Sequence, residues 1–210
     1  LHILLLPDSR RDAPPFYTPL PPGCVNDSEE CAREIPAAGD RLEKPLEEDL
    51  VLIYDLRMSD LLVKLYGLDL APAELPGVTI RRPMPHEMGE VRRWIIRTFG
   101  EGWGDEFVCS FKSFPVTSFV ALRNDAVVGF ATYEATSRGY FGPTGVLESE
   151  RGKGIGKELL VRSMIGLREL GYAYAIIGAA GPTDFYEKSL GAIPIPGSTP
   201  GVYPARKIRE

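Results

Sequence analysis

The sequence predicts a mixed α/β fold in which helices flank a single sheet, behind an N-terminal extension. Segments with strand character alternate with segments of helical periodicity after a proline-rich joint at residues 71–77. Residues 118–135 read as a hairpin with a polar turn. A glycine-rich loop at residues 151–156 leads straight into a helical pattern. We therefore divide the 210 residues into an extension, 1–76, and an α/β domain, 77–210.

The extension is predicted to be an acidic accessory region without a catalytic pattern. It carries 7 Lys and Arg against 15 Asp and Glu. Five prolines between residues 12 and 23 exclude regular structure there, because proline lacks a backbone donor and fixes its φ angle. Residues 47–69 are densely apolar and predict a helix, or a strand followed by a helix. We expect the extension to pack against the main domain or against a second subunit.

The main domain is predicted to arrange its strands and helices around one sheet. Val91, Trp94, Ile95 and Phe99 give the first helix an apolar face, and Gly100 ends it. Glycine and proline within residues 139–148 indicate a β-bulge. The strands are expected at residues 77–83, 118–135 (two strands), 139–148, 172–181, 192–198 and 201–208, and the helices at 86–100, 105–114, 157–170 and 182–191.

Composition excludes several classes of function. Residues 77–210 carry 17 Lys and Arg against 14 Asp and Glu, which suits a small anionic ligand but is too weak for a nucleic-acid surface. No stretch approaches the ~20 apolar residues that span a bilayer, and "HILLL" is too short for a signal-peptide core, so we expect no membrane partner and a cytoplasmic location. Three cysteines without ligand spacing and two distant histidines give no metal site.

Three kinds of phosphate-binding loop compete for the segment "RGKGIGKE". A P-loop fails, because the spacing is one residue short and Glu158 stands where a hydroxyl is needed. A dinucleotide fingerprint is weak, because the spacing is G-x-G-x-G and no parallel βαβ series precedes it. The third pattern, [RQ]-x-x-G-x-[GA] between a strand and a helix, fits residues 151–156.

The physics of such a loop favours a pyrophosphate ligand. Successive backbone N–H groups of a glycine loop point into one concavity, and the next helix adds unpaired N–H groups and the positive end of its dipole. Arg151 and Lys153 add positive charge. The competing interpretation is a plain glycine-rich turn with a solvated basic edge.

The segments "VLESERGKGIGKELL" and "DFYEKSLGA" together resemble the GCN5-related N-acetyltransferase (GNAT) superfamily over residues 77–208. The resemblance implies a mostly antiparallel sheet with flanking helices and acetyl-CoA as the cosubstrate. Two departures concern the strand junctions: no proline follows Val146, and residues 172–181 lack the asparagine of many members. Strings such as "GEGW" and "GFATYEA" are similar to a bacterial branch that acts on small amines, with amino sugars as one acceptor class.

The resemblance also implies roles for individual residues. The backbone of Val146 and Leu147 would face the pantetheine arm of CoA. Tyr186 falls on the tyrosine that faces the thioester sulfur, where a phenol can protonate or hydrogen-bond the departing thiolate. A tyrosine that only fills the core is the alternative. The pyrophosphate would be bound by the main chain of Arg151, Gly152, Lys153, Gly154, Ile155 and Gly156.

The acceptor side is less defined by the resemblance. Glu134 is the first candidate for a general base, with Glu148, Glu101 and Asp105 as others and proton loss to solvent as the alternative. Glu101, Trp103 and Asp105 lie in a link that borders the acceptor site in the family, where Trp103 would offer a flat platform or fill a core gap. The expected reaction is acetylation of a primary amine on a small molecule such as an amino sugar. The alternatives are a protein lysine or N-terminal acetyltransferase and a non-enzymatic acyl-CoA sensor. A homodimer is a further expectation that the sequence does not decide.

Overall fold

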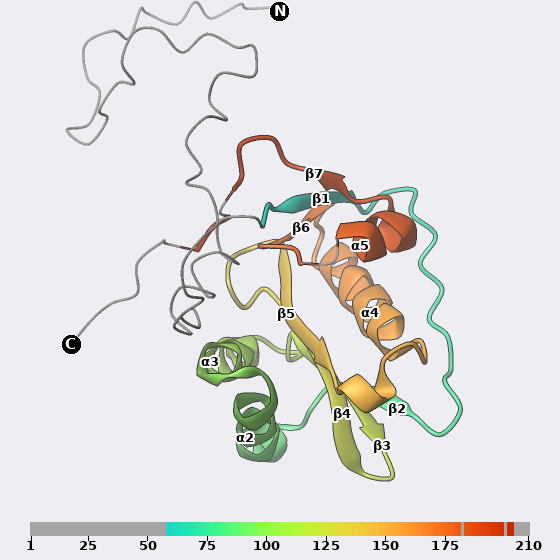
Figure 1. Ribbon diagram of the computed structural model, residues 1–210, viewed down its shortest axis with the longest axis vertical. Helices are drawn as coiled ribbons and strands as arrows, with labels where there is room; N and C mark the ends of the chain where they lie inside the picture. The colour runs from blue at the N-terminus through green and yellow to red at the C-terminus, as the bar shows by residue number, and fades with distance from the viewer. Residues whose placement is uncertain (1–57, 182, 200, 204–210) are drawn as a thin grey trace, which may run out of the picture. The chain divides into compact units, whose positions relative to one another are not determined.

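The computed structural model describes residues 58–181, 183–199 and 201–203 (Figure 1). Their seven-stranded sheet has the order β2-β3-β4-β5-β6-β1-β7, and β5–β6 is the one parallel pairing among the described strands. Helices α2 and α3 lie on one face and α4 and α5 on the other (Figure 1). This confirms the predicted fold class. The strands are β1 (Leu61–Lys64), β2 (Thr79–Arg81), β3 (Ser118–Arg123), β4 (Ala126–Tyr133), β5 (Tyr140–Val146), β6 (Tyr174–Ile177) and β7 (Ile193–Pro194), and the helices are α2 (Met88–Phe99), α3 (Glu101–Cys109), α4 (Ile155–Glu169) and α5 (Thr183–Leu190).

Strand β1 comes from the segment that the sequence assigned to the extension. It lies between β6 and β7 and is antiparallel to both, with Leu61 opposite Ile177 and Pro194. Leu61 and Val63 are fully buried while Lys64 is exposed, a period of two that fits a strand. The helix expected after it does not form, because the chain turns at Gly67, whose φ of 69° is left-handed. The part of the extension that the structure describes therefore contributes to the main sheet.

The central strands follow the prediction closely. Asn124 and Asp125 form the turn between β3 and β4 with φ angles of 49° and 60°. In the pairing of β4 with β5, Ala131 faces Thr144 and Tyr133 faces Phe141, so β5 holds one extra residue at Gly142–Pro143. This is the expected bulge. At the end of the chain, residues 201–203 form no strand, contrary to expectation, and residues 204–208 lie outside the described part.

Helix α3 begins four residues earlier than predicted. Gly100 has a φ of 107° and separates it from α2, so the link "FGEGWGDEF" is mostly helical and not a glycine-hinged loop. Gly104 is buried against α2, where a Cβ atom would lie 2.5 Å from Ile96 Cγ1. Glycine is therefore required for the close approach of the two helices, which outweighs its poor helix propensity. A small core joins them to the sheet through Val91, Ile95, Phe107, Val120 and Phe130.

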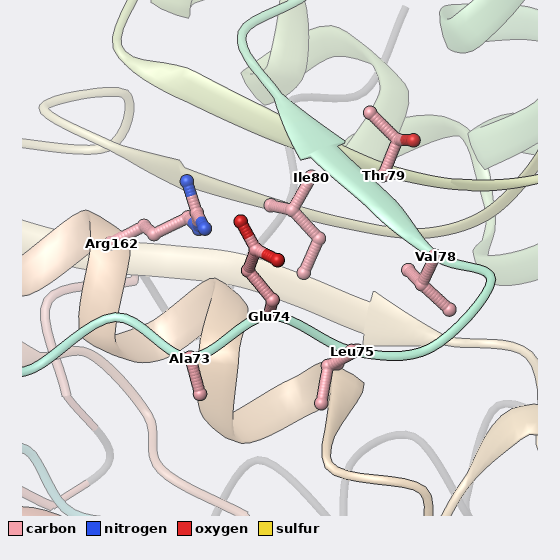
Figure 2. A pocket seen from close by; sticks show the side chains of 7 residues that line it. All are labelled: Ala73, Glu74, Leu75, Val78, Thr79, Ile80 and Arg162. Atoms are coloured by element: carbon pink, nitrogen blue, oxygen red, sulfur yellow. The ribbon is translucent and has the colours of Figure 1, made fainter.

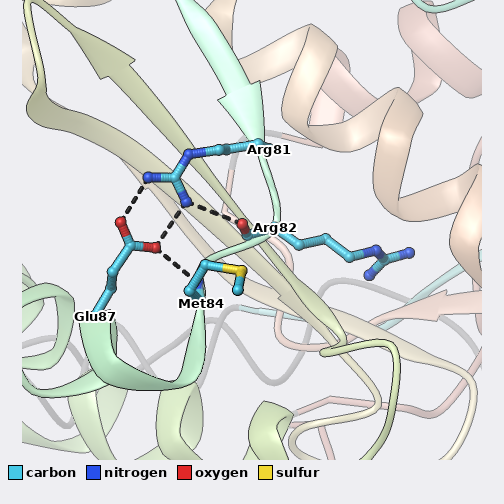
Figure 3. A network of polar contacts seen from close by, with 4 residues as sticks. All are labelled: Arg81, Arg82, Met84 and Glu87. Carbon is cyan, nitrogen blue, oxygen red and sulfur yellow. Dashed lines mark hydrogen bonds and ion pairs between the residues drawn. The ribbon is translucent and has the colours of Figure 1, made fainter.

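A network of polar contacts joins the end of β2 to the start of α2 (Figure 3). Both terminal nitrogens of Arg81 donate to the Glu87 carboxylate, at 2.6 and 2.7 Å, and Met84 N–H donates to the same group at 2.7 Å. The hydrogen bonds from Arg81 lower the pKa of Glu87 to about 2. The carboxylate thereby fixes the turn through which the chain leaves the sheet for α2.

Helix α4 covers the other face of the sheet. Leu160, Met164 and Leu167, the apolar stripe expected from their spacing, are fully buried. They belong to a larger core that also includes Leu61, Phe141 and other residues from β1, β3–β6 and α5. In the described ranges, no helix is both long and apolar enough to cross a bilayer.

Candidate functional site

The glycine loop lies between β5 and α4, and its backbone leaves several donors unpaired. Gly152 and Gly154 have left-handed φ angles of 76° and 86°. Gly154 is the N-cap residue of α4 and supplies no side-chain cap. Within the described part of the chain, no backbone acceptor is found for the N–H groups of Ile155, Gly156 and Lys157. Unpaired N–H groups at the positive end of a helix dipole form a site suited to an anion.

The basic side chains of the loop are exposed but partly engaged. Arg151 Nε donates to Val146 O at 3.3 Å, which folds the guanidinium back over the end of β5. Lys153 Nζ lies 3.2 Å from the Glu150 carboxylate, which also pairs with Arg123. A phosphate ligand would therefore compete with Glu150 for Lys153.

One edge of β5 is open beside the loop. The parallel strands β5 and β6 pair only at Tyr140–Ile176 and Phe141–Ile177, before the bulge. From residue 142 to 146 the edge toward β6 has no partner among the described strands. Val146 pairs with Gly129 on the other edge, and Leu147 is also engaged there, because its N–H donates to Val128 O at 2.9 Å. The open edge offers backbone groups to an extended ligand next to the loop.

Tyr186 lies in the first half of α5 and is 6% exposed. Its ring meets those of Phe141 and Phe185 edge-on, with centroids 6.3 and 5.1 Å away. Burial raises the pKa of its phenol to about 12. No side chain in the described part of the protein hydrogen-bonds its hydroxyl, which therefore stays available to a ligand.

Glu134 closes the turn between β4 and β5. Its φ is 59°, and its carboxylate accepts hydrogen bonds from Gly139 N–H and, at 3.1 Å, from the Tyr172 hydroxyl. These two hydrogen bonds hold the carboxylate in the turn. No contact joins Glu134 to Tyr186.

The three predicted acceptor-side residues lie on α3 but differ in their surroundings. Trp103 stacks on Phe99, with centroids 5.3 Å apart, and stays 39% exposed. It therefore packs against the core with one face and leaves the rest of the indole to solvent. Asp105 is paired with Arg92 at 2.7 Å, and Glu101 is exposed at the start of the helix.

Sequence reasoning did not place Asp60 at the site. Glu106 is one of the carboxylates of the link "FGEGWGDEF", and the structure shows its partners. Glu106 Oε2 accepts from Thr136 Oγ1 at 2.9 Å and from the Tyr203 hydroxyl at 3.3 Å. Asp60 directly precedes β1 and is 5% exposed, with its carboxylate hydrogen-bonded to Ala179 N–H. An aspartate directly before an apolar strand could have indicated Asp60. Because residues 1–76 were assigned to the extension, it was not considered for the site.

A cavity of about 330 Å³ lies on the α4 side of the sheet, between residues 73–80 and α4 (Figure 2). The side chains of Glu74 and Arg162 point toward one another across it (Figure 2). Glu158 holds the covering segment, because its carboxylate accepts from Ala73 N–H at 2.9 Å and from Arg162 at 2.6 Å. None of the residues that line this cavity was predicted to belong to the site. In the described ranges, no three His, Cys, Asp or Glu side chains could together hold a metal ion.

Fold and sequence together define a class, the acetyltransferases. The profile described as the Acetyltransferase (GNAT) family matches residues 88–192, and the chain belongs to this family. The expected enzyme class is thereby confirmed, and acetyl-CoA is the cosubstrate that membership of this family implies. No curated protein matches the sequence.

Solved structures show the same fold at low sequence identity. The glucosamine N-acetyltransferase region of a fungal multi-domain GH3 β-N-acetylglucosaminidase is 15% identical, with a TM-score of 0.52 over 70% of this chain and 22% of that one. A GCN5-related N-acetyltransferase from Sphaerobacter thermophilus is 19% identical, with a TM-score of 0.52 over 71% of this chain and 53% of that one. The chain thus spans about a fifth and about half of the lengths of these two proteins.

Proposed function

We propose that this acetyltransferase acts on the primary amine of a small molecule, with amino sugars as the first acceptor class to test. The observation that supports it most is the glycine loop, whose unpaired N–H groups at the start of α4 suit the pyrophosphate of acetyl-CoA. Residues 151–156 would bind that group, and the open edge of β5, which ends at Val146, would receive the pantetheine arm. The N–H of Leu147 would not take part, because it donates to Val128 O. The donor site is then built entirely from β5, the loop and α4.

Tyr186 is proposed to act on the departing thiolate. Since its pKa is about 12, the phenol stays protonated at neutral pH and can donate a hydrogen bond. A thiol has a pKa near ~8.5, so complete proton transfer from this phenol would be uphill by roughly 3 pK units. Hydrogen bonding to the developing negative charge is therefore its stronger contribution.

The acceptor is proposed to bind on the α3 side of the sheet. Trp103 leaves part of its indole free for a sugar ring, and Glu101 adds negative charge that attracts an ammonium group. Asp105 is paired with Arg92, so an ammonium group would have to compete for its carboxylate. The glucosamine N-acetyltransferase activity named for one structure of this fold is in line with an amino sugar. Glu134 is proposed as the general base, although its carboxylate is already engaged by Gly139 N–H and the Tyr172 hydroxyl. Deprotonation by solvent water is the alternative.

A panel of acceptors tests the proposal directly. The purified protein is incubated with acetyl-CoA and either glucosamine, other small primary amines or lysine peptides, and release of free CoA is followed. We expect turnover with glucosamine-type amines above that with lysine peptides. Preference for the peptides would favour protein acetylation, and acetyl-CoA binding without turnover of any amine would favour a sensor.

A further inference from the structure

We propose that Asp60, which lies outside the part of the chain that matches the family, is a positioning residue for acetyl transfer. It would act by fixing the turn between β6 and α5 and, through α5, the place of Tyr186. This inference rests on the proposed role of Tyr186. The family match begins at residue 88, so its pattern assigns nothing to Asp60.

The carboxylate of Asp60 is bound on both of its oxygens. Oδ1 accepts from Ala179 N–H at 2.9 Å, and Oδ2 accepts from the Tyr140 hydroxyl at 3.3 Å. Asp60 is 5% exposed, so losing these partners would leave a buried polar group without hydrogen bonds. Asp60 therefore joins the start of β5 to the chain just after β6, where the two strands separate.

The backbone next to Asp60 strengthens the same connection. Ser59 O accepts from Ala180 N–H at 3.0 Å, so two successive N–H groups of the turn are bound by the chain before β1. Ala179 has a left-handed φ of 44°, a conformation that needs such support in a residue other than glycine. The turn leads directly into α5, whose residue Tyr186 faces Phe141 of β5. Moving the turn would therefore move the phenol.

The C-terminal segment holds Asp60 itself in place. The N–H of Asp60 donates to Ser198 Oγ at 2.9 Å, and the carbonyl of Asp60 accepts from Ile195 N–H at 2.9 Å. A Cβ atom on Gly201 would lie 3.0 Å from Oδ1, so this glycine allows the segment to pass close to the carboxylate. Two backbone hydrogen bonds and the close approach of Gly201 thus fix Asp60 in the position from which it contacts the turn.

Asp60→Ala and Asp60→Asn separate positioning from general stability. The alanine variant loses both side-chain contacts, whereas asparagine keeps an oxygen for Ala179 N–H. We expect Asp60→Ala to lower kcat by roughly 10²-fold, the cost of a small misplacement of reacting groups, with the KM for acetyl-CoA nearly unchanged. Asp60→Asn should recover most of kcat. Ser110→Ala is the matched control, because it removes a buried hydroxyl that contacts Phe107 O and Ser118, away from the turn.

Hydrogen exchange of peptides covering residues 176–190 gives a readout that needs no acceptor. Asp60→Ala should exchange faster there than wild type, while Asp60→Asn and Ser110→Ala should match wild type. Unchanged exchange in Asp60→Ala would overturn the proposal, as would equal kcat losses in Asp60→Ala and Ser110→Ala. If the wild-type protein acetylates neither glucosamine nor a lysine peptide, the proposed function fails, and the exchange comparison alone decides whether Asp60 positions the turn.

Discussion

The ring of Tyr186 stands edge-on to that of Phe141, with the centroids 6.3 Å apart and the planes at 73°. Phe141 pairs with Ile177 at the last point where β5 and β6 are bonded. The phenol on α5 is thus packed against the place where the two parallel strands separate. A buried tyrosine whose hydroxyl has no protein partner in the described ranges suits a role toward a ligand.

Tyr186→Phe tests this role by removing only the hydroxyl. If the phenol stabilises the departing thiolate, kcat should fall roughly 10²–10⁴-fold, the usual cost of losing such a group, with little change in acetyl-CoA affinity. Phe185→Leu is a control for ring packing alone. Steady-state kinetics and calorimetry measure both effects, and a fully active Tyr186→Phe protein would return Tyr186 to the core.

The pH dependence of the rate follows from the raised pKa of Tyr186, about 12. A phenol with a raised pKa stays protonated at every pH below that value, so it imposes no loss of activity in the neutral and mildly alkaline range. The rate should rise as the acceptor amine loses its proton and show no falling limb below about pH 11. A falling limb near pH 8–9 that disappears in Tyr186→Phe would show that the phenol titrates much lower.

Trp103→Ala is predicted to raise the KM for the amine acceptor and to leave the KM for acetyl-CoA nearly unchanged. The exposed part of the indole would be lost to the acceptor, while the donor site does not include this residue. Because Trp103 also stacks on Phe99, the variant should melt at a lower temperature. Trp103→Phe keeps an aromatic ring against Phe99. Its melting temperature should therefore be closer to that of wild type than its KM for the acceptor is. An acceptor KM that is unchanged in both variants would show that Trp103 only packs in the core.

Leu61→Ala tests whether β1 is part of the folded domain. Leu61 is 1% exposed and packs in the main core, so its truncation should lower the free energy of unfolding by about 2–5 kcal/mol. Leu62→Ala is the matched control. Leu62 is only half-buried, so its truncation should cost clearly less. Denaturant unfolding measures both. Equal, small losses would mean that β1 contributes little to the sheet.

Glu87→Gln should reduce stability in a pH-dependent way. The pKa of Glu87 is lowered to about 2, so the ionised carboxylate stabilises the fold above its ordinary pKa, and this contribution is lost as the pH falls from about 5 to 2. Arg81 is 39% exposed, so solvent screens the pair, and we expect a loss of about 1 kcal/mol at pH 7. The two proteins should be equally stable near pH 2. Glu90→Gln, in the exposed pair with Arg93, should change nothing.

The sequence was most informative where local chemistry decides structure. The Asn124–Asp125 turn, the bulge at Gly142–Pro143 and the apolar stripe of α4 follow from turn residues and periodicity, and all were predicted. The start of α3 was missed because Gly102 and Gly104 read as a loop, and only the contact of Gly104 with Ile96 explains the latter. The place of β1 in the main sheet was missed because its partners, β6 and β7, lie more than a hundred residues away. Asp60 was missed as well, since its side-chain partners Tyr140 and Ala179 lie 80 and 119 residues away in the sequence.

Calorimetric titration with acetyl-CoA, using Gly154→Glu and Gly154→Gln, tests the central claim that the loop binds the donor. Gly154 has a φ of 86°, so both side chains strain the backbone alike, but only glutamate adds a negative charge where the pyrophosphate would lie. We predict saturable binding by wild type, weaker binding by Gly154→Gln and none by Gly154→Glu, with circular dichroism showing that all three are folded. Unchanged acetyl-CoA affinity in a folded Gly154→Glu protein would contradict the account.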